Sequence, residues 1–206
     1  MKHMQKNLIY AAIAIVVVAA VVYGVWGRTW LSDRTESVVV YETASNEAVS
    51  LAFSYPSGEA GYSLIEPPVE GELIDAWIMM GTPDYIKYQQ ADATDAPASM
   101  NVFVFKLPDE AEEAESVERA GRITRLQNWA NEKKNITYID RAYGTPEIVE
   151  IDGVKALKYD TTGLFEQSIY LASYQSNVYM FVGQYDRPTD KIKKDFEDLM
   201  ASVRFE

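Results

Sequence analysis

The chain has 206 residues, no cysteine, a single histidine (His3) and a formal net charge of −12. Its length fits one domain of ordinary size with an added tail or anchor. The acidic balance argues against nucleic acid as a partner, because affinity for phosphates comes largely from Lys and Arg. The absence of cysteine excludes thiol catalysis, zinc–thiolate sites and lipoprotein-type lipid attachment.

Residues Leu8–Trp26 contain no charged side chain. A helix of this length spans roughly 28 Å, close to the thickness of a hydrocarbon core, so we expect a single transmembrane helix. Lys2 and Lys6 precede it, and the positive-inside bias then places residues 1–7 in the cytoplasm and the rest of the chain outside it.

A cleaved signal peptide is the alternative interpretation of this segment. The apolar core of a signal peptide is usually about 7–15 residues long, which is shorter than this run. The bulky residues Val25 and Trp26 also suit a cleavage site poorly. We therefore expect Leu8–Trp26 to be retained as the anchor of a single-pass protein of the cell membrane.

After a polar juxtamembrane linker over 27–36, the sequence predicts a β-rich region that opens one extracytoplasmic domain, 37–206. Alternation or β-branched composition is typical of strands, and Pro56-Ser57-Gly58 is expected to end the second of them. The segment from Pro83 to Pro97 shows no clear pattern, and the small polar run from Gln89 to Ser99 is expected to be an exposed loop. The strands are predicted at Ser37–Glu42, Ala48–Tyr55, Tyr62–Ile65, Leu73–Met79 and Met100–Leu107.

An amphipathic helix is predicted from a cap at Asp109 to Lys134, with acidic residues in its first turns and lysines in its last. Its apolar stripe is Val117, Ala120, Ile123, Leu126, Trp129 and Ala130.

Two hairpins and a closing helix are predicted for the remainder of the chain. Asp152-Gly153 is a two-residue hairpin turn, and Gln175-Ser176-Asn177 joins the second pair of strands. Short connections favour antiparallel pairing, so we expect an α+β domain with an antiparallel sheet flanked by two amphipathic helices. The hairpin strands are Glu147–Ile151, Val154–Tyr159, Gln167–Tyr174 and Val178–Gln184, the helix is Thr189–Ser202, and a short strand follows at Val203–Phe205.

Four sequence features together resemble the PsbP-like superfamily, which includes the DcrB-type envelope proteins and photosystem II extrinsic proteins. They are Leu51–Pro56, Met100–Leu107, Ile151–Ala156 and the closing Phe196–Phe205 segment. The resemblance covers about residues 48–206. It implies an antiparallel sheet flanked by helices that serves protein binding or assembly, and it supplies no catalytic motif or functional residue.

The exposed domain contains no histidine, so Ser-His or Cys-His catalysis and His-ligated metal sites are excluded there. A carboxylate pair, as in glycan-cleaving enzymes, is an open alternative, and so is a sensor for a small molecule or a cation. We expect no catalytic residue, cofactor or structural metal. The carboxylate candidates are Glu66, Glu72, Asp75, Asp160 and Glu166. The cation candidates are Asp92 and Asp95. A further acidic run is better explained as the start of a helix; it contains Asp109, Glu110, Glu112, Glu113 and Glu115.

Tyrosines crowd the last two hairpins. Core packing explains most aromatic residues in such strands, while an exposed tyrosine face would suit recognition of a partner. The candidates for partner contact are Tyr170, Tyr174, Tyr179 and Tyr185. The sequence thus predicts a non-enzymatic binding or assembly domain that is attached to the bilayer by Leu8–Trp26 and contacts an envelope or membrane protein.

Overall fold

The computed structural model describes residues 40–59, 61–69, 74–91, 96–107 and 118–206. All of them belong to the structural unit formed by residues 39–206. The predicted span Leu8–Trp26 and the linker 27–36 lie outside these ranges. Among the residues described, none of the helices combines the length and the apolar character needed to cross a bilayer.

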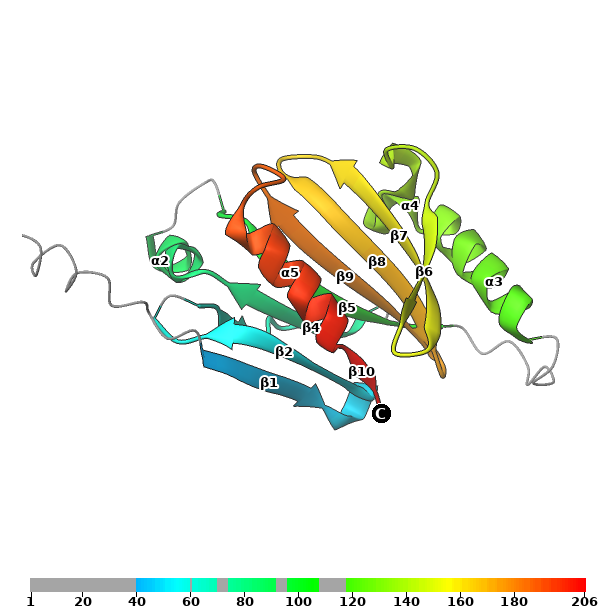
Figure 1. Cartoon of the computed structure of the whole chain (residues 1–206), viewed down its shortest axis with the longest axis horizontal. Helices are drawn as coiled ribbons and strands as arrows, with labels where there is room; N and C mark the ends of the chain where they lie inside the picture. Colours follow the sequence, from blue (N-terminus) through cyan, green and yellow to red (C-terminus); the bar gives the residue numbers. More distant parts are fainter. Residues whose placement is uncertain (1–39, 60, 70–73, 92–95, 108–117) are drawn as a thin grey trace, which may run out of the picture. The chain divides into compact units, whose positions relative to one another are not determined.

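Seven antiparallel strands form the larger sheet, in the order β3-β4-β5-β9-β8-β7-β6 (Figure 1). Strands β6 to β9 run as consecutive hairpins, and β9 pairs with β5 from the first half of the domain. The predicted hairpin turn is confirmed, because Asp152 and Gly153 adopt positive φ angles of 48° and 77°. The strands are β3 (Ser63–Ile65), β4 (Ile74–Gly81), β5 (Ser99–Lys106), β6 (Glu147–Ile151), β7 (Val154–Thr162), β8 (Glu166–Tyr174) and β9 (Asn177–Tyr185).

A second sheet of three strands contains β1 (Val40–Asn46), β2 (Leu51–Ser57) and β10 (Arg204–Phe205), with β2 in the centre. The predicted strand Ala48–Tyr55 begins later than expected, because Glu47–Val49 forms the 3₁₀ turn η1, in which the Asn46 side chain accepts the Ala48 N–H. The strand also continues through Pro56, and the expected break comes at Gly58, whose φ of 86° favours glycine.

Helix α5 (Lys191–Ser202) lies beside this small sheet and completes its layer. The Ser202 hydroxyl accepts the N–H of Ser54 at 2.8 Å, so a helix side chain takes the position of a neighbouring strand. The predicted apolar stripe of this helix is confirmed, since its four members are buried in the core. They are Ile192, Phe196, Leu199 and Met200.

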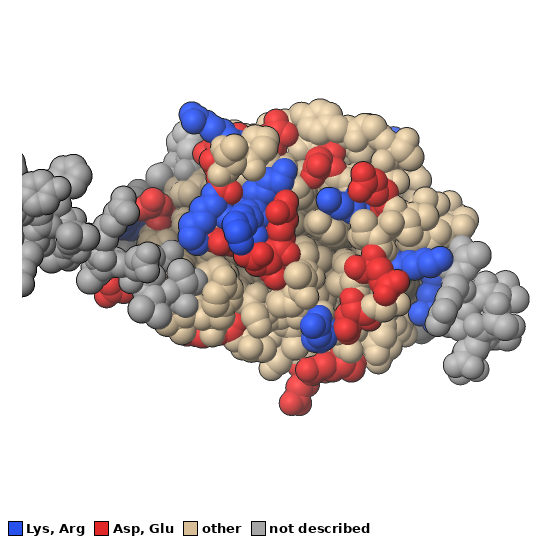
Figure 2. Space-filling view, in the orientation of Figure 1, with Lys and Arg blue, Asp and Glu red and all other residues tan. Residues whose placement is uncertain are grey.

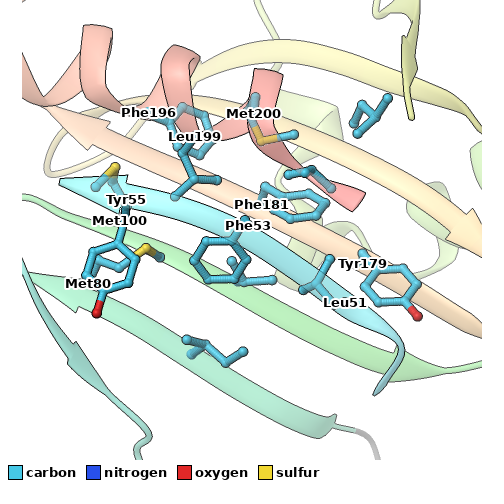
Figure 3. Packing of buried hydrophobic residues seen from close by; sticks show 14 of the residues in the cluster. Leu51, Phe53, Tyr55, Met80, Met100, Tyr179, Phe181, Phe196, Leu199 and Met200 are labelled. Atoms are coloured by element: carbon cyan, nitrogen blue, oxygen red, sulfur yellow. The ribbon is translucent and has the colours of Figure 1, made fainter. Parts of the chain in front are cut away.

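The larger sheet is covered on parts of both faces, which gives three layers. On one face, α5 and β2 of the small sheet cover side chains from β4, β5 and β9 (Figure 3). On the other face, helix α3 (Glu118–Glu132) covers β7 and β8 with Leu126, Trp129 and Ala130. The predicted helix therefore faces the core as expected over its described part, but it ends before Lys133, and the short helix α4 (Lys134–Thr137) and the 3₁₀ turn η2 (Ile139–Arg141) follow.

The loop predicted over Gln89–Ser99 begins later than expected, because helix α2 (Pro83–Ala91) includes its first three residues. The Thr82 hydroxyl accepts the Tyr85 N–H at 3.2 Å, which caps the helix, and Pro83 occupies its first position. The cation candidates Asp92 and Asp95 lie outside the described residues.

The α+β class and the antiparallel pairing are confirmed. The expectation of one sheet with two helices needs correction, since the described residues form two sheets and the helices α2, α3, α4 and α5. The extra sheet arises because β1 and β2 pair with each other and not with the larger sheet, and β10, at the end of the chain, adds a third strand beside β2.

Candidate functional site

The four tyrosines predicted for partner contact all point to the α5 side of the larger sheet, as strand alternation requires. Tyr179 is 0% exposed and its hydroxyl donates to the Val49 carbonyl at 2.6 Å. Tyr185 is 3% exposed and lies 3.2 Å from the Ser168 hydroxyl. These two side chains belong to the core of the folded domain and are not available to a partner.

Tyr170 and Tyr174, both on β8, are only half-buried. The Tyr170 ring meets the Phe196 ring of α5 edge to face at 5.8 Å, and Tyr174 stacks on Phe205 at 5.0 Å. Helix α5 packs on β2, β5 and β9, while β6, β7 and β8 lie beside it (Figure 1). We call the α5-side surface of these three strands the β6–β8 face; it contains Glu147, Val149, Val154, Ala156, Lys158, Asp160, Glu166, Ser168, Tyr170, Ala172 and Tyr174.

Lys158 lies at the centre of the β6–β8 face. Its ammonium is 5.6 Å from the centre of the Tyr170 ring. Partial burial lowers the pKa of Lys158, but the Tyr170 hydroxyl and the nearby carboxylates of Asp160 and Glu147 outweigh it and raise the pKa overall. The side chain is therefore a cation at all physiological pH values.

Tyr170 is a neutral phenol under the same conditions. Burial is the largest cause that raises its pKa; Lys158 opposes this rise, and Glu197 and Asp160 add to it. A phenol of this kind can donate a hydrogen bond and stack against a ligand, but it is a poor nucleophile or base.

Two of the carboxylate candidates, Asp160 and Glu166, lie on the β6–β8 face, on neighbouring strands that pair as Asp160–Ser168 and Thr162–Glu166. The Ser168 hydroxyl donates to Asp160 at 2.6 Å, and Lys158 is close to the same carboxylate. Asp160 thus has a structural role in the network around Tyr170.

The other described carboxylate candidates are not brought to this face. Glu66 and Asp75 are exposed near β3 and β4, and Glu72 lies outside the described residues, as does the acidic run from Asp109 to Glu115. Within the described ranges, acidic residues and histidines form no group of three or more that could hold a metal ion.

Two features of the structure were missed by sequence reasoning. Lys158 and Asp160 alternate with the buried residues Leu157 and Tyr159, and charges at every second position indicate a sheet face that no helix covers. On α5, Asp195 is 5% exposed; it accepts a hydrogen bond from Tyr62 at 2.8 Å and pairs with Lys191. Its position three residues after Ile192, on the apolar stripe, was the available signal.

The buried phenols predict alkaline unfolding. Burial raises the pKa of both Tyr62 and Tyr159, and in Tyr62 the Asp195 carboxylate adds to the rise. Folding then favours the protonated phenols, so their contribution to stability is complete below about pH 10, the usual tyrosine pKa, and is lost as pH rises above it. We expect the urea midpoint to be constant from about pH 7 to 9 and to fall between about pH 10 and 11.

The control for this prediction is the double variant Tyr62→Phe with Tyr159→Phe, which removes both phenols. Its midpoint should fall less steeply over the same pH range, although it starts lower because two hydrogen bonds are lost. An unchanged slope would show that other groups cause the alkaline transition.

Comparison with known proteins places the fold. No family model matches the chain, and no curated protein matches its sequence. The solution structure of cyanobacterial PsbP (CyanoP) from Synechocystis sp. PCC 6803 is similar with a TM-score of 0.51 and 11% sequence identity, over 82% of this chain and 95% of that chain. A crystal structure from Bacteroides thetaiotaomicron gives a TM-score of 0.43 and 9% identity, over 80% of this chain and 48% of that chain. The domain has a PsbP-like fold, as the resemblance of its sequence predicts.

Proposed function

We propose that this protein is a membrane-tethered, non-catalytic binding or assembly domain that contacts a protein partner outside the cytoplasm through its β6–β8 face. The observation that carries the proposal is the half-buried pair Tyr170 and Tyr174 on a sheet face beside α5. Tyrosine is enriched at protein interfaces, where its ring supplies contact area at low entropic cost and its hydroxyl makes hydrogen bonds.

The chemistry of the face supports binding over catalysis. The domain has no histidine or cysteine to act as a base or nucleophile. The polar groups of the face are engaged with one another, Ser168 with Asp160 and Lys158 with Tyr170. Such a network positions side chains for contact and leaves no free base beside a nucleophile.

The proposed tether is Leu8–Trp26, with the amino terminus in the cytoplasm. A tether keeps the domain close to other membrane components and raises their effective concentration to about the millimolar range. Weak contacts with a neighbouring membrane or envelope protein then suffice for binding.

Site-specific crosslinking tests the partner contact. A photo-crosslinking aromatic amino acid replaces Tyr174 in the full chain, in cells that express it at its natural level. We expect irradiation to yield one discrete adduct with another protein. The matched control places the same amino acid at Tyr143, which is 56% exposed and outside the β6–β8 face. Equal adducts at both positions, or none at position 174, would contradict the proposed contact.

Deletion of residues 1–36 tests the tether separately. We expect the full chain to stay with the membrane fraction during alkaline carbonate extraction and the shortened chain to leave it completely, because only the full chain carries the apolar span. A protease added outside the cytoplasmic membrane should digest the domain of the full chain. Release of the full chain by carbonate would refute the anchor, and protection of the domain would reverse its orientation.

A further inference from the structure

We infer that the β6–β8 face binds a basic segment of a partner protein in which apolar residues are interspersed with Arg or Lys. This inference rests on the proposed function and adds the chemistry of the partner. It follows from three features of this face: an apolar centre, which we call the floor, acidic residues around it, which we call the rim, and the position of Lys158 among them.

The floor of the face is low and apolar. The strand register places Val149, Ala156 and Ala172 side by side across β6, β7 and β8. Both alanines are 0% exposed, whereas Val149 and the tyrosines of β8 are partly exposed at the edge of the core. The alanines are covered by their neighbours, so the apolar surface open to a second molecule is that of Val149, Tyr170 and Tyr174.

The rim of the face is acidic. The next row of the sheet contains Glu147, Lys158 and Tyr170, and Asp160 follows on β7. Glu147 and Asp160 both act on Lys158, and Glu197 of α5 acts on Tyr170. Two carboxylates thus act on the one ammonium and a third acts on the neighbouring phenol, and Figure 2 shows acidic groups, with some basic ones beside them, over this part of the domain.

The lysines of α5 do not reverse this balance. Lys191 pairs with Asp195, and Lys194 pairs with Asp198. Lys193 lies over the Tyr185 ring, 4.9 Å from its centre. The electrostatic complement of the β6–β8 face is therefore a cationic segment.

Lys158 shows how such a segment is recognised. Its ammonium lies beside a tyrosine ring and between carboxylates, as the cationic side chain of a partner would. Arginine suits the same surroundings, because its planar guanidinium stacks on aromatic rings and bonds carboxylates in pairs. An amphipathic basic segment satisfies the rim and the floor together.

The test measures binding of synthetic peptides to the full chain in nanodiscs of zwitterionic lipid. The probe is a 14-residue amphipathic peptide of Lys and Leu, and its counterpart carries Glu in place of Lys. We expect the basic peptide to perturb the NMR signals of Val149, Tyr170 and Tyr174, and to bind less well as salt rises. Perturbation elsewhere, equal binding of the acidic peptide, or self-association through this face without peptide would overturn the inference.

Lys158→Gln is the sharpest variant, because it should increase binding. Removal of the ammonium leaves the carboxylates of the face uncompensated, so affinity for the basic peptide should rise about two- to fivefold. The matched control is Lys155→Gln, which changes the same charge on the opposite side of the same strand and should have little effect. An equal gain in both variants would mean that only the net charge of the domain matters.

The rim is tested by loss of charge at exposed positions. The double variant Glu147→Gln with Glu197→Gln should lower the affinity for the basic peptide about five- to tenfold. The control, Glu132→Gln with Glu150→Gln, makes an equal charge change elsewhere and should lower the affinity less than twofold. Equal losses would refute the β6–β8 face as the binding surface for basic segments. A specific crosslink from position 174 would still stand in that case, so failure of this inference differs from failure of the proposed function.

Discussion

Replacing Phe196 with alanine is expected to lower the free energy of unfolding by about 3–5 kcal/mol. The side chain is 1% exposed, contacts Gly183 of β9 and meets the Tyr170 ring of β8, so it joins α5 to the centre of the larger sheet (Figure 3). Truncation removes the buried ring and leaves a cavity between the two layers. Urea denaturation followed by circular dichroism measures the change.

The control for Phe196→Ala is Tyr143→Ala, which removes an aromatic side chain that is 56% exposed. Its effect should stay within about 0.5 kcal/mol. A loss below about 1 kcal/mol in Phe196→Ala would show that α5 contributes little to the core. The Phe196 variant should also lose its preference for the crosslink at position 174, because the Tyr170 ring no longer has its buried neighbour.

Replacing Gly183 with alanine is expected to destabilise the domain by about 1–3 kcal/mol. A methyl group at this position would overlap the ring of Phe196, whereas the backbone of β9 itself accepts alanine. The strand and the helix must then separate, or the ring must leave its position. The urea midpoint again reports the cost.

A double variant identifies the cause of this effect. In the Phe196→Ala background the added methyl group occupies vacated space, so Gly183→Ala should cost much less than it does alone. Additive effects would place the strain elsewhere. Gly121→Ala is the matched control, because nothing lies near its added methyl group; within α3 it should stabilise the domain by about 0.5–1 kcal/mol.

The two variants also bear on the proposed site. Gly183 allows Phe196 to lie directly on β9, and Phe196 in turn meets the inner edge of Tyr170. The position of α5 over β9 therefore determines which strands of the larger sheet are left uncovered on the α5 side. A core substitution that moves α5 should change binding at the β6–β8 face without altering any residue of that face.

The sequence alone determined those parts of the fold that depend on neighbouring residues. Alternation in Met100–Leu107 corresponds to β5, and Asp152-Gly153 supplies the positive φ angles of the hairpin turn. The spacing of Ile192, Phe196, Leu199 and Met200 predicted the buried side of α5. These signals are local, since side-chain period and turn geometry follow directly from residue type.

The tertiary structure decided what depends on distant residues. Helix α2 is polar and carries no clear apolar stripe, so only its cap at Thr82 indicated it. The second sheet gains its third strand only when β10 reaches β2, and no local pattern specifies that pairing. Alternation placed Tyr170 and Tyr179 on the same side of the sheet, but α5 covers β9 and leaves β8 at its edge. One tyrosine is therefore core and the other is surface, because exposure depends on the packing of layers and not on the order of residues within a strand.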